Sequence, residues 1–358
     1  MKILVLQLNG IGDLVLTLPF LHGLRRRYPH SRITLMAAHW AKDLGLIEAG
    51  AIDDLIICDV PWVVHQYINP WSFVRSLFSI QSVSAIFDAA KKLRPCRFDL
   101  SVEMRGDVRH ALILYFAEIR QRVGQPFRFA HFFLTQSVKY SIPPNDWHQN
   151  KVNQMLATTM GFEIVDNFPR LKLPGVGSEA DSANSVMRLM VHMGASKSLK
   201  QWPFEKWIEL IKKATVFTPI EIDICSSDQA AVELALAEVP RKDISIRVHY
   251  LPLKDFIAAI GCSHLFIGAD SGPAHVAAAL GVPVIVLFGP TRPSQWAPIG
   301  LQVTSLAVPD ESVPCRPCRQ KVCIHPQYHH CMQMISVEEV FDCVHTQISK
   351  LKNDLDEA

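Results

Sequence analysis

The chain has 358 residues, with 36 Lys and Arg against 34 Asp and Glu, which gives a formal net charge of +2 at pH 7. This near balance excludes a general nucleic-acid binder, because such proteins carry an extended basic surface. The length exceeds that of one ordinary domain and predicts two domains of about 150 to 180 residues each.

The N-terminal sequence "MKILVLQLNG" contains a short apolar run that Gln7 and Asn9 interrupt. The run is too brief for a signal-peptide core, so we interpret it as a first buried strand. The longest apolar region, residues 274–290, contains a histidine, a glycine and an internal proline and is too short to span a bilayer. These features predict a soluble, cytoplasmic protein with no nucleic-acid partner.

The first half of the chain alternates short apolar runs with longer amphipathic stretches, as in strands joined by crossover helices. A helix is predicted at Leu21–Tyr28, and the predicted strands are "KILVLQL", "RITLMAA", "DLIICD" and "FDLSVEM". The pattern is typical of a parallel sheet. We therefore expect a Rossmann-like N-terminal domain over residues 1–168.

Residues 166–184 are rich in Pro, Gly and small polar side chains, which predicts a linker near the middle of the chain. After it the alternation begins again, with a helix in "PFEKWIELIKKATVF" and strands in "SVMRLMVHMG", "IEIDICS", "SIRVHYL", "HLFIGAD" and "PVIVLFG". We expect a second Rossmann-like domain over residues 180–345 and a tail over 346–358. Two such domains predict a ligand site in the cleft between them.

The stretch "LFIGADSGPAHVAAALGVPVIVLFGP" has the pattern of a strand, a turn and a helix. The strand ends at Asp270, Ser271 suits the N-cap, Pro273 suits the first helical turn, and Gly281 ends the helix. Free N–H groups and the helix dipole then face one way and favour a bound phosphate, to which His275 adds a donor. The alternative is purely structural, because any strand–turn–helix unit needs such a cap.

This stretch resembles the most characteristic block of glycosyltransferase family 9, the heptosyltransferase family of lipopolysaccharide core assembly: Asp-(Ser/Thr)-Gly-Pro-x-His-x-Ala-Ala-Ala-Leu-Gly, followed by Gly-Pro-Thr. Three other blocks agree in the expected order, namely "GIGDLVLTLPFLHGLRRRYP", "FDLSVEMRGDVR" and "GASKSLKQWPFEKWIEL". The resemblance runs from residue 3 to about residue 340. It implies an α/β GT-B fold, in which two Rossmann-like domains face an interdomain cleft and the C-terminal domain holds the nucleotide sugar.

The resemblance also implies a donor site. Lys200 occupies the position of the family lysine that contacts the donor phosphates, where a fixed ammonium stabilises the charge of the departing diphosphate. Lys197 is a candidate second contact, and Asp228 is the nearest candidate for the acidic residue that holds the donor ribose. The predicted phosphate-binding residues are Ser196, Lys200, Asp270, Ser271, Gly272 and His275.

Asp13 follows two glycines in "LQLNGIGDLVLTLP". A dinucleotide-binding loop needs a third glycine where Val15 stands and an acidic residue after the second strand, and both are missing. The resemblance places the family's proposed catalytic base at Asp13, which would take a proton from the acceptor hydroxyl during inverting transfer. The alternative for Asp13 is a helix N-cap, although Pro19 disfavours a continuous helix there.

The acceptor side is less specific. Residues 60–80 and 126–133 are aromatic and apolar, which suggests either core packing or contact with a membrane surface or a lipid-linked acceptor. The block "VEMRGDVR" and the residues after it supply candidates for an anionic acceptor, which we do not rank: Arg105, Asp107, Arg109, Arg120 and Arg122.

The sequence "CRPCRQKVCIHPQYHHC" contains four cysteines with C-x2-C-x4-C-x7-C spacing: Cys315, Cys318, Cys323 and Cys331. Two interpretations are open: a structural zinc or iron, or free or disulfide-paired thiols. A catalytic metal is not expected, because transfer in the GT-B fold uses lysine and amides for the leaving group. Four cysteines in apolar surroundings are expected to be buried: Cys58, Cys96, Cys225 and Cys262.

Together these features predict an inverting glycosyltransferase that needs no cofactor for catalysis. It would move heptose, or a related sugar, from an ADP-sugar to a saccharide or glycolipid acceptor of lipopolysaccharide core or a similar glycoconjugate. One alternative is a transferase that uses another nucleotide sugar for O-antigen or glycoprotein assembly, and another is a non-catalytic nucleotide-sugar-binding protein. A peripheral position at the inner face of the cytoplasmic membrane is compatible with each.

Overall fold

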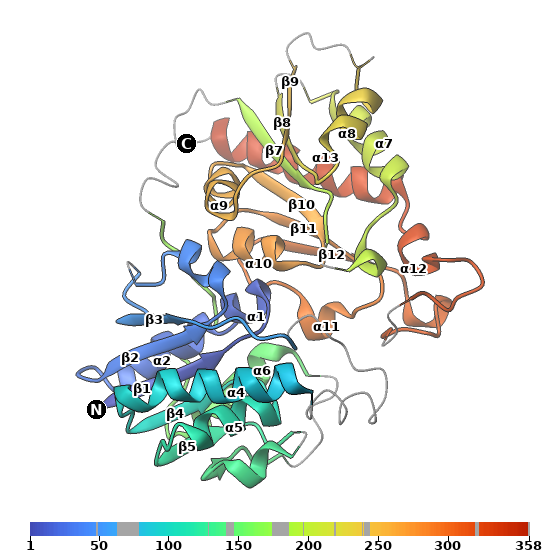
Figure 1. Cartoon of the computed structure of the whole chain (residues 1–358). Helices are drawn as coiled ribbons and strands as arrows, with labels where there is room; N and C mark the ends of the chain where they lie inside the picture. The colour runs from blue at the N-terminus through green and yellow to red at the C-terminus, as the bar shows by residue number, and fades with distance from the viewer. Residues whose placement is uncertain are drawn as a thin grey trace. The chain divides into compact units, whose positions relative to one another are not determined.

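The computed structural model describes residues 1–47, 49–62, 79–127, 129–140, 147–173, 186–195, 197–217, 220–237, 239, 244–318 and 322–356. The chain divides into two compact α/β units, Met1–Leu171 and Lys172–Ala358 (Figure 1). The boundary falls within the predicted linker, residues 166–184, much of which lies outside the described residues.

The first unit contains a six-stranded parallel sheet in the order β3-β2-β1-β4-β5-β6. Its strands are β1 (Lys2–Gln7), β2 (Arg32–Ala37), β3 (Asp54–Ile57), β4 (Leu100–Glu103), β5 (Gln121–Gly124) and β6 (Gln136–Ser137). The four predicted strands are confirmed, because each apolar run forms a buried or half-buried strand of the sheet. The sequence analysis missed β5 and β6, which are short and partly polar.

The helices of this unit are α1 (Ile11–Val15), α2 (Leu18–Arg27), α4 (Ile80–Leu93), α5 (Val108–Phe116) and α6 (Gln149–Thr159), with 3-10 turns η1 (His39–Leu44), η2 (Arg94–Cys96) and η3 (Ala130–Phe133). The predicted helix at residues 21–28 is the later part of α2. Because α1 ends at Val15 and Thr17 starts a new helix, Pro19 lies in the first turn of α2, where a missing N–H costs no helical hydrogen bond.

The second unit repeats this architecture with the sheet order β12-β11-β10-β7-β8-β9. Its strands are β7 (Met187–His192), β8 (Ile220–Cys225), β9 (Ile244–His249), β10 (Leu265–Ala269), β11 (Val284–Phe288) and β12 (Val303–Ala307). Every residue of β10 and β11 is buried, which explains their continuous apolar sequence. In chain order both sheets read 3-2-1-4-5-6, the strand order of the Rossmann fold.

The helices of the second unit are α7 (Phe204–Ala214), α8 (Gln229–Ala235), α9 (Leu253–Gly261), α10 (Gly272–Ala279), α11 (Pro293–Trp296), α12 (His330–Gln333) and α13 (Val337–Asp356), with η5 (Ser198–Lys200) and η6 (Asp310–Ser312). Helix α13 packs against α7 and includes residues 346–356, which the sequence analysis assigned to a tail (Figure 1). Ile348 in this segment is buried in the core of the unit, so the segment is part of the packed structure.

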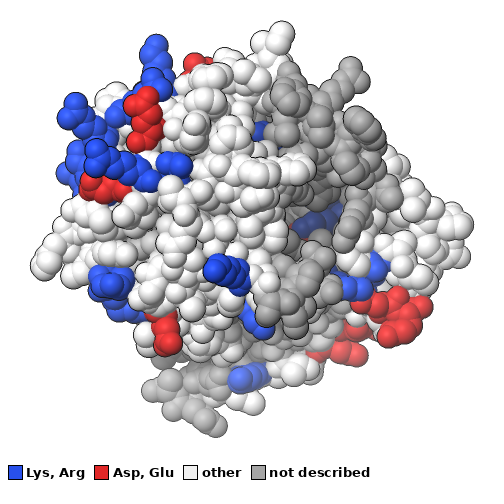
Figure 2. Space-filling model, turned by 90° about the horizontal axis from the view of Figure 1, so that it is seen from below, with Lys and Arg blue, Asp and Glu red and all other residues white. Residues whose placement is uncertain are grey.

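The surface carries charges of both signs. Figure 2 shows one face, on which Lys and Arg occur in small separated groups, some with Asp or Glu beside them, among mostly uncharged side chains. This distribution agrees with the balanced composition. Over the described part of the chain, no helix is both long enough and apolar enough to cross a membrane.

Candidate active site

The strand order determines which loops meet in each unit. In the first unit the loops after β1 and β4 leave neighbouring strands at the same edge of the sheet, and in the second unit the loops after β7 and β10 do so. These are the points where the strand order reverses, and open α/β sheets bind ligands there. Asp13 follows β1, Lys200 follows β7 and Asp270 follows β10.

Asp13 lies in the short helix α1, where Gly10 is the N-cap residue. The alternative interpretation of Asp13 as the N-cap is therefore wrong. Its Oδ1 lies 3.2 Å from Nη1 of Arg105, and its side chain is 17% exposed. The carboxylate is thus paired with a cation and still reachable from solvent.

Arg105 is fixed by the turn that follows β4. Its backbone N–H donates to Oε1 of Glu103 at 2.9 Å, and the N–H of Gly106 donates to Oε2 at 2.5 Å. Gly106 has φ +75°, and a Cβ there would lie 2.6 Å from Phe127, so a larger residue does not fit. The Arg105 Nη1 also donates to Oε1 of Gln149 at 2.7 Å, which holds its side chain beside Asp13.

The buried Glu103 is itself satisfied by His110. The indole N–H of Trp62 donates to Nε2 of His110 at 3.2 Å, so the imidazole proton must be on Nδ1. That N–H donates to Oε1 of Glu103 at 3.0 Å. Glu103 therefore accepts three hydrogen bonds in an environment without solvent access.

A second chain of hydrogen bonds returns from α6 to α1. The side-chain amide of Gln149 donates to Oδ1 of Asn153 at 3.2 Å, and Nδ2 of Asn153 donates to the carbonyl of Leu16 at 2.9 Å. Together with the Arg105–Gln149 bond, these contacts link α1, the loop after β4 and α6. The surroundings of Asp13 are held from three elements.

Two other arginines of the predicted acceptor group are bound within the unit. Arg109 is buried over the ring of Trp62 and pairs with Asp107. Burial alone would raise the pKa of Asp107, but hydrogen bonds and charge from Arg109 hold that pKa below its usual value. The guanidinium of Arg122 donates to the carbonyls of Phe133 and Ile119. The described structure therefore places Arg105, among these three, beside Asp13.

In the second unit Lys200 and Asp270 form an ion pair. The ammonium of Lys200 donates to Oδ2 of Asp270 at 2.5 Å, and the hydroxyl of Thr291 donates to the same oxygen at 2.5 Å. The Asp270 side chain is 5% exposed and that of Lys200 is 16% exposed. An ammonium has three N–H donors, so Asp270 can orient it without using all of them.

Ser271 occupies the N-cap position of α10, as predicted, but its hydroxyl does not cap the helix. It donates instead to the carbonyl of Ala269 at 3.1 Å. The first-turn amides of α10, including that of Gly272, thus receive no side-chain cap. Such amides and the helix dipole favour an anion, and the buried His275 lies in the same turn.

The two remaining predicted donor residues are Ser196 and Asp228. Ser196 lies outside the described residues. Asp228 is the N-cap of α8, where its Oδ1 accepts from the N–H of Ala231 at 3.1 Å. The structure therefore gives Asp228 a helix-capping role.

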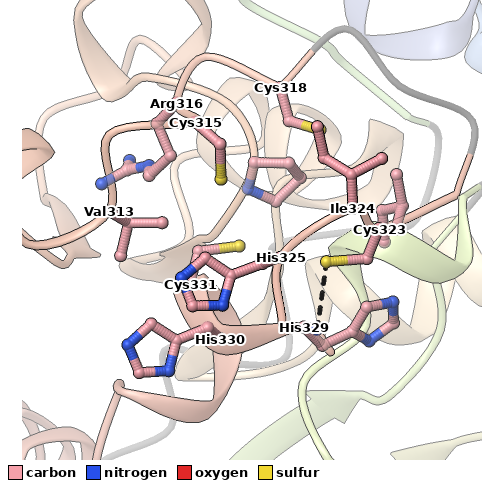
Figure 3. Close-up of a pocket in the computed structure, with 12 residues that line it drawn as sticks. Val313, Cys315, Arg316, Cys318, Cys323, Ile324, His325, His329, His330 and Cys331 are labelled. Atoms are coloured by element: carbon pink, nitrogen blue, oxygen red, sulfur yellow. Dashed lines mark hydrogen bonds between the residues drawn. The ribbon is translucent and has the colours of Figure 1, made fainter. Parts of the chain in front are cut away.

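The four clustered cysteines line one pocket, together with Leu199, Pro290, Val313, Arg316, Ile324, His325, His329 and His330 (Figure 3). All nine cysteines of the chain are free thiols, which removes the disulfide interpretation. Burial raises the pKa of Cys331 to about 11, and the neighbouring thiols add to this effect. No three potential ligands within the described residues are grouped closely enough to hold a metal.

The isolated cysteines are less buried than predicted. Cys58 is buried, whereas Cys96, Cys225 and Cys262 are only half-buried. Each of these three lies at or beyond the end of a strand or helix, where the apolar run that suggested burial has already stopped.

Two units with the Rossmann strand order, each with a charged pair at the point where that order reverses, define an α/β protein of the doubly wound class. Residues 86–329 match the model of glycosyltransferase family 9 (heptosyltransferase). The chain belongs to this family, its fold is GT-B, and it is a glycosyltransferase.

Comparisons with individual proteins agree with this family assignment. The chain is 23% identical to lipopolysaccharide heptosyltransferase 1 of Pseudomonas aeruginosa over 91% of its own length and 88% of that protein. Its fold is similar to that of E. coli heptosyltransferase WaaC with ADP, with a TM-score of 0.67, 16% identity and coverage of 97% and 100%. It is also similar to the iron-containing dodecameric glycosyltransferase TibC of enterotoxigenic E. coli, with a TM-score of 0.55, 13% identity and coverage of 99% and 76%.

The structure adds residues that the sequence analysis did not single out. Gln149 and Thr291 contact Arg105 and Asp270, respectively, and Arg105 itself was one of several unranked candidates. Thr291 was visible as the end of the Gly-Pro-Thr turn, but no local pattern showed that its hydroxyl reaches Asp270.

We expect Glu103→Gln to lower the free energy of unfolding of the first unit by about 2–4 kcal/mol. Both carboxylate oxygens accept N–H bonds, so either orientation of a glutamine amide sets an NH₂ group against a buried donor. Urea denaturation measures the change, with the exposed Glu118→Gln as control. Equal stabilities of the two variants would contradict this account of the turn.

Proposed function

We propose that the protein transfers heptose, with inversion and without a catalytic metal, from ADP-heptose to a saccharide acceptor of lipopolysaccharide core or a similar glycoconjugate. The Lys200–Asp270–Thr291 arrangement beside the start of α10 is the observation that carries this proposal. Family membership, the heptosyltransferase names of the relatives and the ADP bound in the WaaC structure support it.

In the donor site, Lys200, the first amides of α10 and His275 would hold the diphosphate, because each offers a positive charge or an N–H donor. Asp270 is a carboxylate and would repel the diphosphate, so we assign it to holding Lys200 rather than to direct contact. Ser196 keeps its proposed phosphate contact. For Asp228 we propose that Oδ1 caps α8 and Oδ2 binds the ribose.

On the acceptor side, Asp13 would act as general base. Arg105 is paired with Oδ1, and we assign Oδ2 to the acceptor hydroxyl. As Asp13 takes the hydroxyl proton, the oxygen attacks the anomeric carbon from the face opposite the diphosphate. The charge that develops on the leaving ADP is balanced by Lys200 and α10.

Two variants with different expected effects on transfer and on ADP binding test these roles. Asp13→Asn keeps the side-chain shape but cannot take the proton, so transfer should fall roughly 100- to 10,000-fold with ADP affinity nearly unchanged. Lys200→Ala should weaken ADP binding measured by calorimetry. Full activity of Asp13→Asn would remove it from the mechanism. A larger thermal shift with GDP- or UDP-sugars than with ADP-heptose would favour the alternative donor.

The acceptor is proposed to be a saccharide or a glycolipid. Phe129 and Phe132 are 59% and 70% exposed, with ring centroids 6.4 Å apart, and this apolar surface suits a lipid-linked acceptor at the inner face of the membrane. Residues 63–78 lie outside the described part of the chain. We expect co-sedimentation with anionic vesicles that Phe129→Ser/Phe132→Ser abolishes. Equal sedimentation of both proteins, or none, would favour a soluble saccharide.

For the cysteine pocket we propose a structural zinc or iron that Cys315, Cys318, Cys323 and Cys331 would hold after their side chains move closer together than they lie in this structure. Thiolate sulfur is the donor type that suits these metals, and a bound cation would offset the burial and the neighbouring thiols that raise the pKa of Cys331. The iron-containing TibC has a similar fold, which is compatible with the proposal.

Metal removal tests this site. We expect about one zinc or iron per chain by elemental analysis, and a lower melting temperature after chelation. The double variant Cys315→Ser/Cys318→Ser should contain no metal, and its melting temperature should not change on chelation. The control Cys262→Ser should keep the metal and should still lose stability on chelation. Protein purified without oxygen that contains neither metal would refute the proposal.

A further inference from the structure

The cysteine pocket adjoins both sides of the donor-phosphate site. Leu199, the residue before Lys200, lines it, and so does Pro290, the residue before Thr291. The loop that carries the cysteines therefore lines a pocket together with the two segments whose side chains meet at Asp270. Because these segments line the same pocket, the cysteine-bearing loop can also support the residues around Asp270.

Three contacts join the cysteine-bearing loop to the turn Gly289–Thr291. The guanidinium of Arg316 donates from Nη2 to the carbonyl of Thr291 at 2.9 Å, and the N–H of Cys318 donates to the carbonyl of Pro290 at 2.7 Å. At Gly289 an added Cβ would lie 2.1 Å from Sδ of Met332, so α12 packs directly on the turn. Each residue of the turn is thus held by the segment 316–332.

Arg316 is well placed to act as an anchor. It is 6% exposed, and its Nη1 donates to the carbonyl of Val308. Asp310 pairs with Arg316 at 3.5 Å and with Arg292 at 2.8 Å. A buried guanidinium with several fixed partners has little freedom, so it holds the Thr291 carbonyl in one place.

Thr291, the last residue of the Gly289–Thr291 turn, contacts Asp270. The Thr291 hydroxyl and the Lys200 ammonium donate to the same oxygen, Oδ2, each at 2.5 Å. A carboxylate that loses one of two donors at one oxygen can rotate about its terminal torsion, which is broad. The position of Lys200 therefore depends on Thr291, although Thr291 has no described bond to Lys200.

We propose that Thr291 and Arg316 are positioning residues for the donor-phosphate lysine: the cysteine-bearing loop fixes the Gly289–Thr291 turn, and Thr291 fixes Lys200 through Asp270. The inference rests on the proposed donor site and assigns it a support that lies outside the nucleotide contacts.

Nucleotide binding to the full-length protein provides the first test. Thr291→Val should weaken ADP binding by about 5- to 20-fold but leave adenosine binding within about 2-fold, because only the diphosphate uses Lys200. Thr291→Ser should restore ADP affinity, and Thr304→Val, the same change in β12, should have no effect. Arg316→Lys should act in the same direction as Thr291→Val. A general loss of structure would weaken ADP and adenosine alike and would contradict the proposal.

A double-mutant cycle separates positioning from direct contact. If Thr291 acts through Lys200, Thr291→Val should add nothing to the loss of ADP affinity in a Lys200→Ala background. Additive losses would mean that Thr291 binds phosphate itself and would overturn the proposal.

A ligand-free readout distinguishes failure of the proposed donor site from failure of the positioning role. Trace acetylation, quantified by mass spectrometry, should modify Lys200 several-fold faster in Thr291→Val than in the parent protein. Lys206, whose ammonium donates to the carbonyls of Gln333 and Ile335, is the control and should not change. If the parent protein does not bind ADP but Lys200 is labelled faster in Thr291→Val, the proposed donor is wrong and the positioning role of Thr291 stands. Unchanged Lys200 labelling would refute the positioning role.

Discussion

The strand order of the two parallel sheets is the constraint on which the site depends. In each unit the first and fourth strands in chain order are neighbours, and their helices cover opposite faces, so the loops after them meet at one sheet edge. This brings Asp13 to Arg105 across about 90 residues of sequence, and Lys200 to Asp270 across 70. Burial of the central strands makes both edges rigid, which is what a fixed charge requires.

The two edges use the same kind of pair for opposite purposes. In the proposed mechanism the carboxylate of Asp13 is the reactive group, and the cation Arg105, whose backbone N–H donates to the buried Glu103, is its support. In the proposed donor site the ammonium of Lys200 is the group that contacts the diphosphate, and the carboxylate of Asp270 is its support. In each pair the supporting residue has the additional hydrogen bonds, so the reactive one can still exchange its partner for a substrate.

Sequence patterns predicted the central strands, and they marked Asp13 and Lys200 as candidate site residues without identifying the side chains that contact them. The apolar runs identified the central strands, because those strands are buried on both faces, and Asp13 and Lys200 lie in blocks that local pattern and family resemblance both mark. Which of several arginines lies beside Asp13 depends on the tertiary path of α6 and the loop after β4, which no spacing encodes. For the same reason residues 346–358 were predicted to be a tail: the segment is mostly polar, and the burial of Ile348 depends on the packing of α13 in the core of the second unit.

In the proposed arrangement, the cysteine-bearing loop supports Lys200 without contacting the nucleotide. Positioning a lysine to within a few tenths of an ångström needs a chain of short, buried contacts, because exposed contacts are weakened by water and by competing rotamers. The segment 316–332 provides such contacts to all three residues of the Gly289–Thr291 turn. Arg316, Cys318 and Met332 supply these contacts, and Arg316 is itself buried and donates to the carbonyl of Val308. In the proposed arrangement, the order of the donor site would therefore depend on how well this segment packs against the Gly289–Thr291 turn.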